Sequence, residues 1–416
     1  MPFANLEQTA KTLDGEDSLS SFRSRFELPS DVIYFDGNSL GPMLKGVPER
    51  VETTLRHEWA EGLIRSWNEA DWITIADKIA ARIAPLIGAT PDSVTVTDST
   101  SINLFKLLSA AVKMNDARNE IVSLNQNFPT DLYIAQGLRD FLGSGHKLQL
   151  AQKSAEISGL ISDKTAVVML THVDFRTGEM LDMENITKTA HEHGALVVWD
   201  LAHSVGAVPV HLDNVEADFA VGCGYKYLNG GPGAPSFLYV NKKHIGKAIQ
   251  PITGWFSHAS PFNFESGYKP DQSVNQFQCG TPPILSMIAL DESLKLWEEV
   301  DLAQIREKSL KLTDFFIECI NTSGLDQYFE NVTPLTHTDR GSHVSLSFDG
   351  DGYAVMQALI DQGIIGDFRT PDILRFGFAP LYTTFAEVCQ AVEILHEIMS
   401  NETWKEERFS QRKAVT

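Results

Sequence analysis

The sequence predicts an α/β fold, in which a large domain built on a mainly parallel β-sheet is followed by a smaller α+β C-terminal domain. Two observations lead to this prediction. Between residues 83 and 240, short apolar runs rich in β-branched residues alternate with helical patterns, as is typical of parallel strands covered on both faces. After about residue 283, two long amphipathic patterns come first, and single strands and helices then alternate.

The large domain is expected to contain strand–helix–strand units. Strands are predicted over 94–97, 121–124, 166–170 and 195–199, and a further apolar run covers 219–221. Helices are predicted over 104–112 and 183–193, and the second helix is closed by Gly194, a residue that favours the helix C-cap position. This alternation implies a parallel sheet.

The smaller domain is expected to begin at residue 284. Helices are predicted over 285–300, 303–322, 353–362 and 385–399, and strands over 343–348 and 373–378. Residues 1–45 are interpreted as an extended, loop-like N-terminal arm, residues 46–283 as the large domain and residues 284–416 as the small domain.

Composition and charge exclude several classes of function. The 416 residues include 34 Lys and Arg against 55 Asp and Glu, which gives a formal charge of -21. Nucleic acids and anionic membranes are therefore not expected as partners, because both need a basic surface. Any anionic ligand must be held by a local device, since the overall field repels it.

The cysteines and the N-terminus indicate a cytoplasmic protein. The four cysteines are far apart and form no CxxC pair, so neither a metal site nor a disulfide framework is expected. Residues 1–26 contain no apolar signal core, and no apolar run approaches the length of a membrane-spanning helix. We expect a soluble protein in a reducing compartment.

Two charged residues follow predicted strands and are candidates for chemistry. Asp200 comes directly after the apolar run 195–199, at the strand end where ligands of open α/β sheets gather. Lys226 lies between glycines and aromatics after the run 219–221, where partial desolvation would make its amine a nucleophile and base. Considered one at a time, Asp200 is explained equally well as an aspartate that caps the following turn, and Lys226 as an ordinary surface lysine.

Two further segments lie at neighbouring strand ends. Thr100 and Ser101 begin the helix after the first strand, where free N–H groups and hydroxyls form a phosphate cradle; plain N-capping explains the same residue types. Phe128 and Asp131 lie in a segment interpreted as a proline-stiffened loop, from which the ring is able to stack on a flat heterocycle or to cover the core. An acid, a lysine, a helix N-terminus and an aromatic ring together are the components of a pyridoxal phosphate (PLP) site.

Several motifs in the chain resemble the kynureninase family. They are YFDGNSLG at 34–41, GLIRSW at 62–67, WDLAHS at 199–204, YKYLNGGPG at 225–233, LRFG at 374–377 and PLY at 380–382. The similarity runs in order from about residue 14 to the C-terminus. It implies the fold-type I PLP-dependent transferase fold, a homodimer with active sites at the interface, and PLP as cofactor.

The resemblance assigns a role to each candidate residue. It implies that Lys226 bonds to the PLP aldehyde, that Asp200 pairs with the pyridine nitrogen, and that Phe128 stacks on the ring. Further cofactor contacts are implied for Thr100, Ser101, Asp131, Thr171, His203 and Tyr225, and for Trp255 and Thr281 from the second subunit. Arg375 is implied to bind the substrate carboxylate, and Asn38 and Trp67 to line the aryl pocket, although core or interface packing explains the last two equally well.

The implied reaction is hydrolysis of the Cβ–Cγ bond of L-kynurenine, or of 3-hydroxykynurenine, to anthranilate and L-alanine in tryptophan degradation. Lys226, Tyr225 and Asp200 are the expected catalytic residues, with Tyr225 as the acid. An aminotransferase or a cysteine desulfurase of the same fold type is the alternative enzyme, and a PLP-fold protein without activity is the non-enzymatic alternative. His343 is interpreted as a packing residue.

Overall fold

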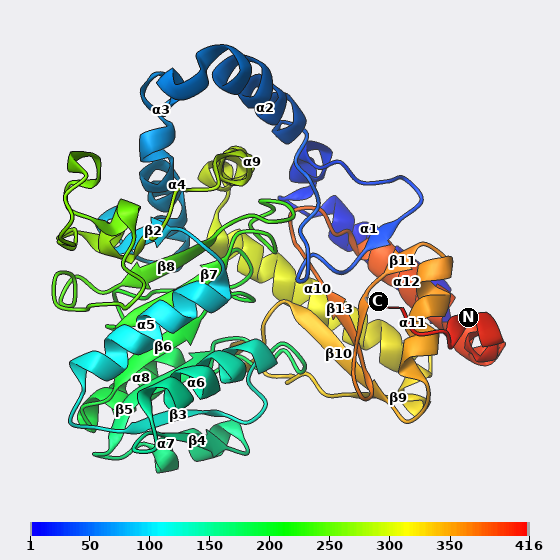
Figure 1. The fold of residues 1–416 in the computed structure, drawn as a ribbon. Helices are drawn as coiled ribbons and strands as arrows, with labels where there is room; N and C mark the ends of the chain where they lie inside the picture. The colour runs from blue at the N-terminus through cyan, green and yellow to red at the C-terminus, as the bar shows by residue number, and fades with distance from the viewer. Residues whose placement is uncertain (1, 414–416) are drawn as a thin grey trace.

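The computed structural model describes residues 2–413. Two sheets lie beside each other, the seven-stranded sheet at the left and the four-stranded sheet at the right of Figure 1. The helices are α1 (Pro2–Gly15), α2 (Val47–Thr53), α3 (Ser66–Glu69), α4 (Ile75–Ile83), α5 (Thr100–Met114), α6 (Pro129–Leu142), α7 (Ile157–Leu160), α8 (Met183–Glu192), α9 (Ile284–Leu294), α10 (Leu302–Thr322), α11 (Gly352–Asp361) and α12 (Phe385–Ser400).

The strands are β1 (Ile33–Tyr34), β2 (Val94–Val96), β3 (Glu120–Leu124), β4 (Lys147–Ala151), β5 (Thr165–Thr171), β6 (Leu196–Asp200), β7 (Phe219–Cys223), β8 (Ser236–Val240), β9 (Phe329–Asn331), β10 (His343–Phe348), β11 (Ile364–Ile365), β12 (Asp367–Arg369) and β13 (Ile373–Gly377). The predicted strands and helices are confirmed with shifts of a few residues at their ends, except for the helix predicted over 285–300, which is shorter.

The seven-stranded sheet has the order β2-β8-β7-β6-β5-β3-β4 and is mainly parallel, as the sequence predicts. The strands from β7 to β4 run parallel, whereas β8 is antiparallel to both of its neighbours, β7 and β2. Strand β2 therefore runs in the same direction as β7. As a result, the carboxyl ends of β2, β7, β6, β5 and β3 all lie at one edge of the sheet.

Helices cover both faces of this sheet. On one face, Leu107 of α5 and Leu138 of α6 share an apolar cluster with Met169 of β5. On the other face, Ile79 of α4 and residues of α8 and α9 pack with the alternate side chain Val168 of the same strand. Because both faces are buried, the central strands are apolar almost throughout.

The four-stranded sheet, β12-β13-β10-β9, is antiparallel and packs against α10, α11 and α12. Its core is aromatic: the Phe316 ring of α10 lies 5.0 Å from Phe376 and 5.3 Å from Phe378, measured between ring centroids. Helix α9, just after the predicted boundary at residue 283, packs against α2 and α4 beside the larger sheet. The domain boundary itself stays a prediction.

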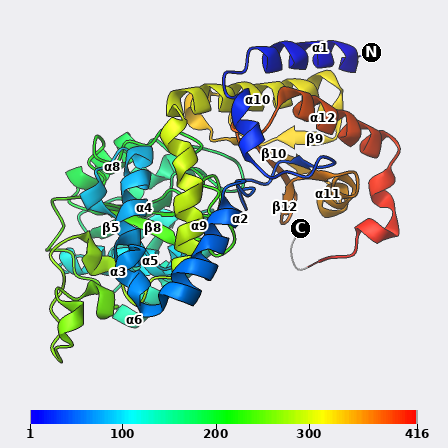
Figure 2. The ribbon, with the colours of Figure 1, turned by 90° about the horizontal axis from the view of Figure 1, so that it is seen from above.

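The expectation of an extended N-terminal arm is wrong for residues 2–15, which form α1. Leu6 and Ala10 are buried against the small-domain core, and α1 packs on α12. Figure 2 shows α1 alongside α10 and α12, on the side away from the larger sheet. Phe3 and Leu13 are partly buried against the same core, so the apolar positions 3, 6, 10 and 13 do follow a helical spacing that the sequence interpretation did not use.

Two further interpretations need correction. The segment around Phe128 is not a loop beyond that residue, because α6 begins at Pro129, a residue suited to the first helical position. The helix predicted over 285–300 is α-helical only as far as Leu294 and continues as a 3₁₀ turn to Glu299. Among residues 2–413, no helix is long and apolar enough to cross a membrane.

Candidate active site

A cavity of about 180 Å³ opens at the carboxyl edge of the seven-stranded sheet. Nine predicted site residues line it: Thr100, Ser101, Phe128, Asp131, Thr171, Asp200, His203, Tyr225 and Lys226. They come from the segments that follow β2, β3, β5, β6 and β7. The parallel topology therefore brings together residues that are as far apart as 126 positions in the sequence, from Thr100 to Lys226.

Two buried carboxylates lie at the base of the cavity. Asp200 ends β6, and its Oδ1 accepts a hydrogen bond of 2.6 Å from the Ala202 N–H. Burial raises the pKa of Asp200, while Lys226 opposes the shift. Burial, and then the proximity of Asp200, hold the pKa of Asp131 well above its usual range. Asp131 therefore keeps a proton, and the negative charge of the pair resides on Asp200.

Lys226 and His203 are in direct contact in the wall of the cavity. The Lys226 Nζ lies 3.1 Å from the His203 Nε2, which is also 3.1 Å from the carbonyl oxygen of Asn38. Burial and the nearby Lys226 hold the pKa of His203 well below its usual range, so this imidazole is neutral. Gly41 is needed beside the lysine loop, because a Cβ at this position would lie 2.2 Å from the Lys226 carbonyl oxygen.

Aromatic rings form one side of the cavity. Phe128 is 39 % exposed, and its ring meets that of Phe175 edge-on at 5.2 Å. The exposed Phe128 ring is therefore free to pack against a ligand. Cys223, and then burial, raise the pKa of the Tyr225 hydroxyl, which stays protonated and is a hydrogen-bond donor.

Sequence reasoning missed Thr130, Phe175 and Ala202, which also line the cavity. Phe175 could have been predicted in the same way as Phe128, because each of the two lies four residues after the end of a strand of the parallel sheet. Ala202 and Thr130 are small neighbours of predicted residues and carry no signal of their own.

A second cavity of about 660 Å³ adjoins the first. Thr100, Ser101 and Tyr225 line both cavities, and Thr281 lines the second. Thr100 and Ser101 are the first residues of α5, whose N-cap is Ser99. Their free N–H groups and hydroxyls give this end of the cavity the donors that an anion needs.

Arg375 does not line either cavity. It is buried in β13, where its Nε donates to Asp367 Oδ1 at 2.9 Å and its Nη2 contacts both Asp367 and Ser39. Its Nη1 donates to the carbonyl oxygen of Phe175 at 2.7 Å. Although burial favours the neutral acid, Arg375 and Arg369 hold the pKa of Asp367 below its usual range.

Three other predicted residues lie outside the first cavity. Trp255 is 41 % exposed and contacts Phe256, Phe262 and Phe264. Trp67 contacts Phe256 and Trp72. The side chain of Asn38 is buried, and neither amide atom has a partner among the described residues.

His343 and Cys223 are buried beside the site without lining the cavity. His343 is fully buried, its ring lies 5.6 Å from that of His203, and its pKa is lowered to about 3 by burial. Cys223 is buried beside the site and behaves as a small apolar side chain. Within residues 2–413, no group of three or more His, Cys, Asp or Glu side chains has the arrangement of a metal site.

Solved structures support the fold. An apo cysteine desulfurase from Thermococcus onnurineus superposes with a TM-score of 0.78 at 22 % identity, covering 92 % of this chain and 98 % of the other. A C-DES variant with glycine covalently linked to its PLP cofactor gives a TM-score of 0.78 at 18 % identity, covering 90 % and 99 %. The predicted fold-type I architecture is confirmed.

Sequence comparisons identify the family. A family model described as the kynureninase C-terminal domain matches residues 305–395, and one described as the DegT/DnrJ/EryC1/StrS aminotransferase family matches residues 65–210. The kynureninase of Pseudomonas fluorescens is 49 % identical over 97 % of this chain and 98 % of its own length. That of Burkholderia mallei is 48 % identical over 98 % and 99 %. The chain belongs to the kynureninase family.

Proposed function

We propose that this chain uses PLP to hydrolyse the Cβ–Cγ bond of L-kynurenine, giving anthranilate and L-alanine. The observation that carries the proposal is the convergence of Lys226 and Asp200 in one cavity at the carboxyl edge of the sheet, in a chain of this family. The desulfurase alternative is disfavoured because the full-length relatives are kynureninases and because none of the four cysteines, of which only Cys279 is not fully buried, lines either cavity.

The residues of the cavity fit PLP. Asp200 holds the negative charge of a buried carboxylate pair, which suits a protonated ring nitrogen. Phe128 offers an exposed ring face, and the start of α5 offers N–H groups and hydroxyls to a phosphate. Lys226 supplies the amine that bonds to the aldehyde. When bound, PLP supplies an electron sink for bonds broken next to the substrate amine.

The chain's own residues then place the substrate and move protons. With PLP and substrate bound, Lys226 would be the base that takes the proton from the substrate α-carbon, since it lines the cavity and its Nζ lies 5.9 Å from the centroid of the Phe128 ring. Tyr225 is a protonated donor at the wall and returns a proton to the departing alanine fragment. Arg375 anchors the α-carboxylate once the substrate replaces one of the contacts that the guanidinium makes with Asp367, Ser39 and the Phe175 carbonyl oxygen, and the unpartnered amide of Asn38 is available to the substrate.

Replacing Lys226 tests the proposal. We expect Lys226→Ala to abolish anthranilate formation and the visible absorbance of bound PLP, because no amine remains to bond to the aldehyde. The assay follows anthranilate fluorescence with kynurenine and PLP and no added keto acid, conditions in which an aminotransferase gives no steady product. Unchanged turnover in this variant would refute the proposal.

The proposal extends to a homodimer in the cytoplasm. Trp255, Phe262 and Phe264 form an exposed aromatic group, and a surface of this kind favours contact with another protein surface. In this arrangement Trp255 and Thr281 complete the phosphate site of the second subunit. All four cysteines, which lie in the described part of the chain, are free thiols, as is usual in a reducing compartment.

A further inference from the structure

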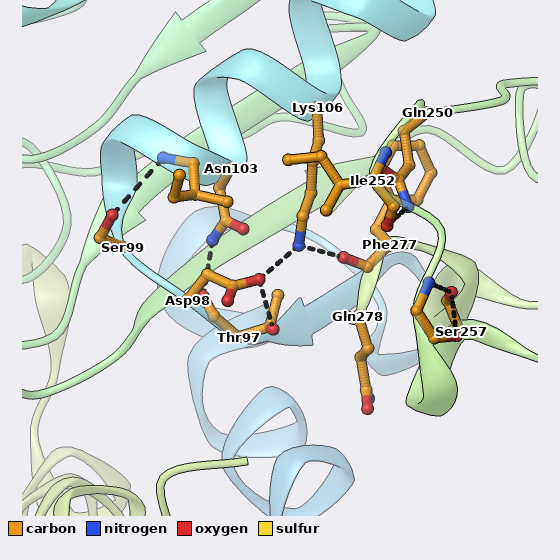
Figure 3. A network of polar contacts seen from close by, with 12 residues as sticks. Thr97, Asp98, Ser99, Asn103, Lys106, Gln250, Ile252, Ser257, Phe277 and Gln278 are labelled. Carbon is orange, nitrogen blue, oxygen red and sulfur yellow. Dashed lines mark hydrogen bonds and ion pairs between the residues drawn. The ribbon is translucent and has the colours of Figure 1, made fainter. Parts of the chain in front are cut away.

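A buried lysine lies directly behind the proposed phosphate site. Lys106, on the second turn of α5, has no exposed surface. Its Nζ lies 2.5 Å from Asp98 Oδ2 and 2.6 Å from the carbonyl oxygen of Phe277, as Figure 3 shows. The mechanism proposed above does not use this residue.

The first contact fixes the loop that leads into α5. Asp98 has a φ of 46°, in the left-handed region that is unfavourable for residues other than glycine and tolerated by aspartate. Its carboxylate also accepts from the Thr97 hydroxyl at 3.0 Å, and the Asn103 amide donates to the Thr97 carbonyl at 2.8 Å. These contacts set the direction in which the backbone N–H groups of Thr100 and Ser101 point.

The second contact fixes the opposite wall. Phe277 ends a 3₁₀ turn, and the chain continues through Gln278, whose side chain donates to the Thr95 hydroxyl at 3.2 Å, to Thr281. Thr281 and Thr100 line the same cavity of this chain, and in the proposed dimer Thr281 is directed to the phosphate of the second subunit. Lys106 therefore joins two of the segments beside this cavity, the 97–101 segment and the one that leads through Phe277 to Gly280 and Thr281.

The charge of Lys106 matters as much as its position. Asp98 lines the cavity, and its side chain is 30 % exposed, so an unpaired carboxylate here would repel a phosphate dianion. Of the described residues that line the two cavities, Lys226 is the only lysine or arginine. In a chain of formal charge -21, the neutralisation of Asp98 removes a local obstacle to anion binding.

We propose that Lys106 is a positioning residue for the phosphate of the cofactor, which joins the 97–101 and 277–281 segments and neutralises Asp98. The inference rests on the proposed function, in that PLP places its phosphate at the start of α5. Lys106 touches neither the cofactor nor the substrate, so its effect must be specific to ligands that carry the phosphate.

The test compares two ligands that differ only in this group. Apo-protein is titrated with PLP and with pyridoxal, which has the same aldehyde and ring without the phosphate, and the absorbance of the Lys226 adduct gives each dissociation constant. In Lys106→Met we expect the constant for PLP to rise about tenfold or more, as a lost charge-assisted contact implies. The constant for pyridoxal should change less than about twofold.

Lys308 provides a matched control. It is a buried lysine on α10 whose Nζ contacts one carboxylate, Asp17, at 2.7 Å and one backbone carbonyl, that of Pro380, at 2.5 Å. Lys308→Met removes the same kind of contact from the small domain. We expect the ratio of the PLP and pyridoxal constants to stay at the wild-type value in this variant.

A double variant tests the inference even if Lys106→Met alone does not fold. Lys106→Met/Asp98→Asn leaves no unpaired buried charge, and we expect it to bind PLP more tightly than the single variant and more weakly than wild type, with pyridoxal unaffected. A wild-type ratio of the two constants in the double variant would overturn the inference, as would an equal loss for both ligands. Failure of the wild-type protein to bond PLP at Lys226 would instead overturn the proposed function.

Discussion

At the scale of single residues, the site depends on buried charges held by specific partners. Arg375 and Asp367 are each 1 % exposed in their side chains and form a two-point ion pair across β12 and β13. The pair fixes the plane of the guanidinium, whose third nitrogen, Nη1, donates to the carbonyl oxygen of Phe175. Asp367 lies near Asp36, whose pKa is raised to about 7 by burial and by Asp367.

Arg375→Lys tests this rigidity. A lysine keeps the positive charge but loses the planar fork, so we expect the KM for kynurenine to rise by about 10- to 100-fold, which corresponds to about 1.4 to 2.8 kcal/mol. Steady-state kinetics measure the change, and PLP uptake, followed by absorbance, should match wild type. An unaltered KM would contradict a role for Arg375 in carboxylate binding.

The residues of the cavity could be predicted because each is marked by the few residues next to it in the sequence. Asp200, Lys226 and Phe128 each follow an apolar strand, and the parallel topology converts this shared position into spatial proximity. The partners of Arg375 gave no such signal, since the pairing of Asp367 with Arg375 depends on the register of two short strands. The protonation of Asp131 likewise depends on burial against Asp200, which only the folded chain reveals.

At the scale of elements, the N-terminal segment stabilises the last helix of the chain. The Asp14 carboxylate accepts hydrogen bonds from the backbone N–H groups of Phe385 and Ala386, at 2.8 and 2.9 Å, at the start of α12. Thr384 and Glu387 form a capping box at the same helix end. Two first-turn N–H groups of α12 thus depend on a residue about 370 positions earlier in the chain.

Asp14→Ala should lower the free energy of unfolding by about 1 kcal/mol, because the two N–H groups lose their acceptor. Urea denaturation monitored by circular dichroism measures the change. Asp116→Ala is the comparison variant, since Asp116 is 74 % exposed and makes one long ion pair with Lys113, and it should alter stability by less than about 0.5 kcal/mol. Equal effects in the two variants would contradict the capping role.

The sequence revealed the elements themselves more readily than their partners. The central strands are continuous apolar runs because both of their faces are buried, and α5, α8, α10 and α12 have a clear helical periodicity because one face is buried. Helix α1 was missed although Phe3, Leu6, Ala10 and Leu13 recur at a helical spacing. Strand β4 was also missed, because it lies at the sheet edge and begins with the exposed Lys147.

At the scale of the whole molecule, buried histidines couple stability to pH. Burial lowers the pKa of His172 to about 4 and that of His343 to about 3, both from 6.5. Between the lowered values and 6.5, the unfolded chain binds protons that the folded chain does not bind. Stability from these groups is therefore complete above pH 6.5 and is lost as the pH falls below it.

His343→Leu tests this coupling. Neither ring nitrogen of His343 has a partner among the described atoms, so leucine leaves no polar group unsatisfied. We expect the slope of unfolding free energy against pH to decrease by up to about 1.4 kcal/mol per pH unit below pH 6.5. Urea denaturation at several values between pH 5 and 7.5 gives the slope. His57→Gln, at an exposed position, should retain the wild-type slope.

The packing of α1 on α12 determines the order in which the molecule is completed during synthesis. Helix α1 finds its binding surface only when α12 has also been synthesised, roughly 20 to 80 seconds later at about 5 to 20 residues per second. The seven-stranded sheet is fully translated well before that moment. Until then, the surface of α1 that carries Leu6 and Ala10 lacks the partner that buries it in the folded chain.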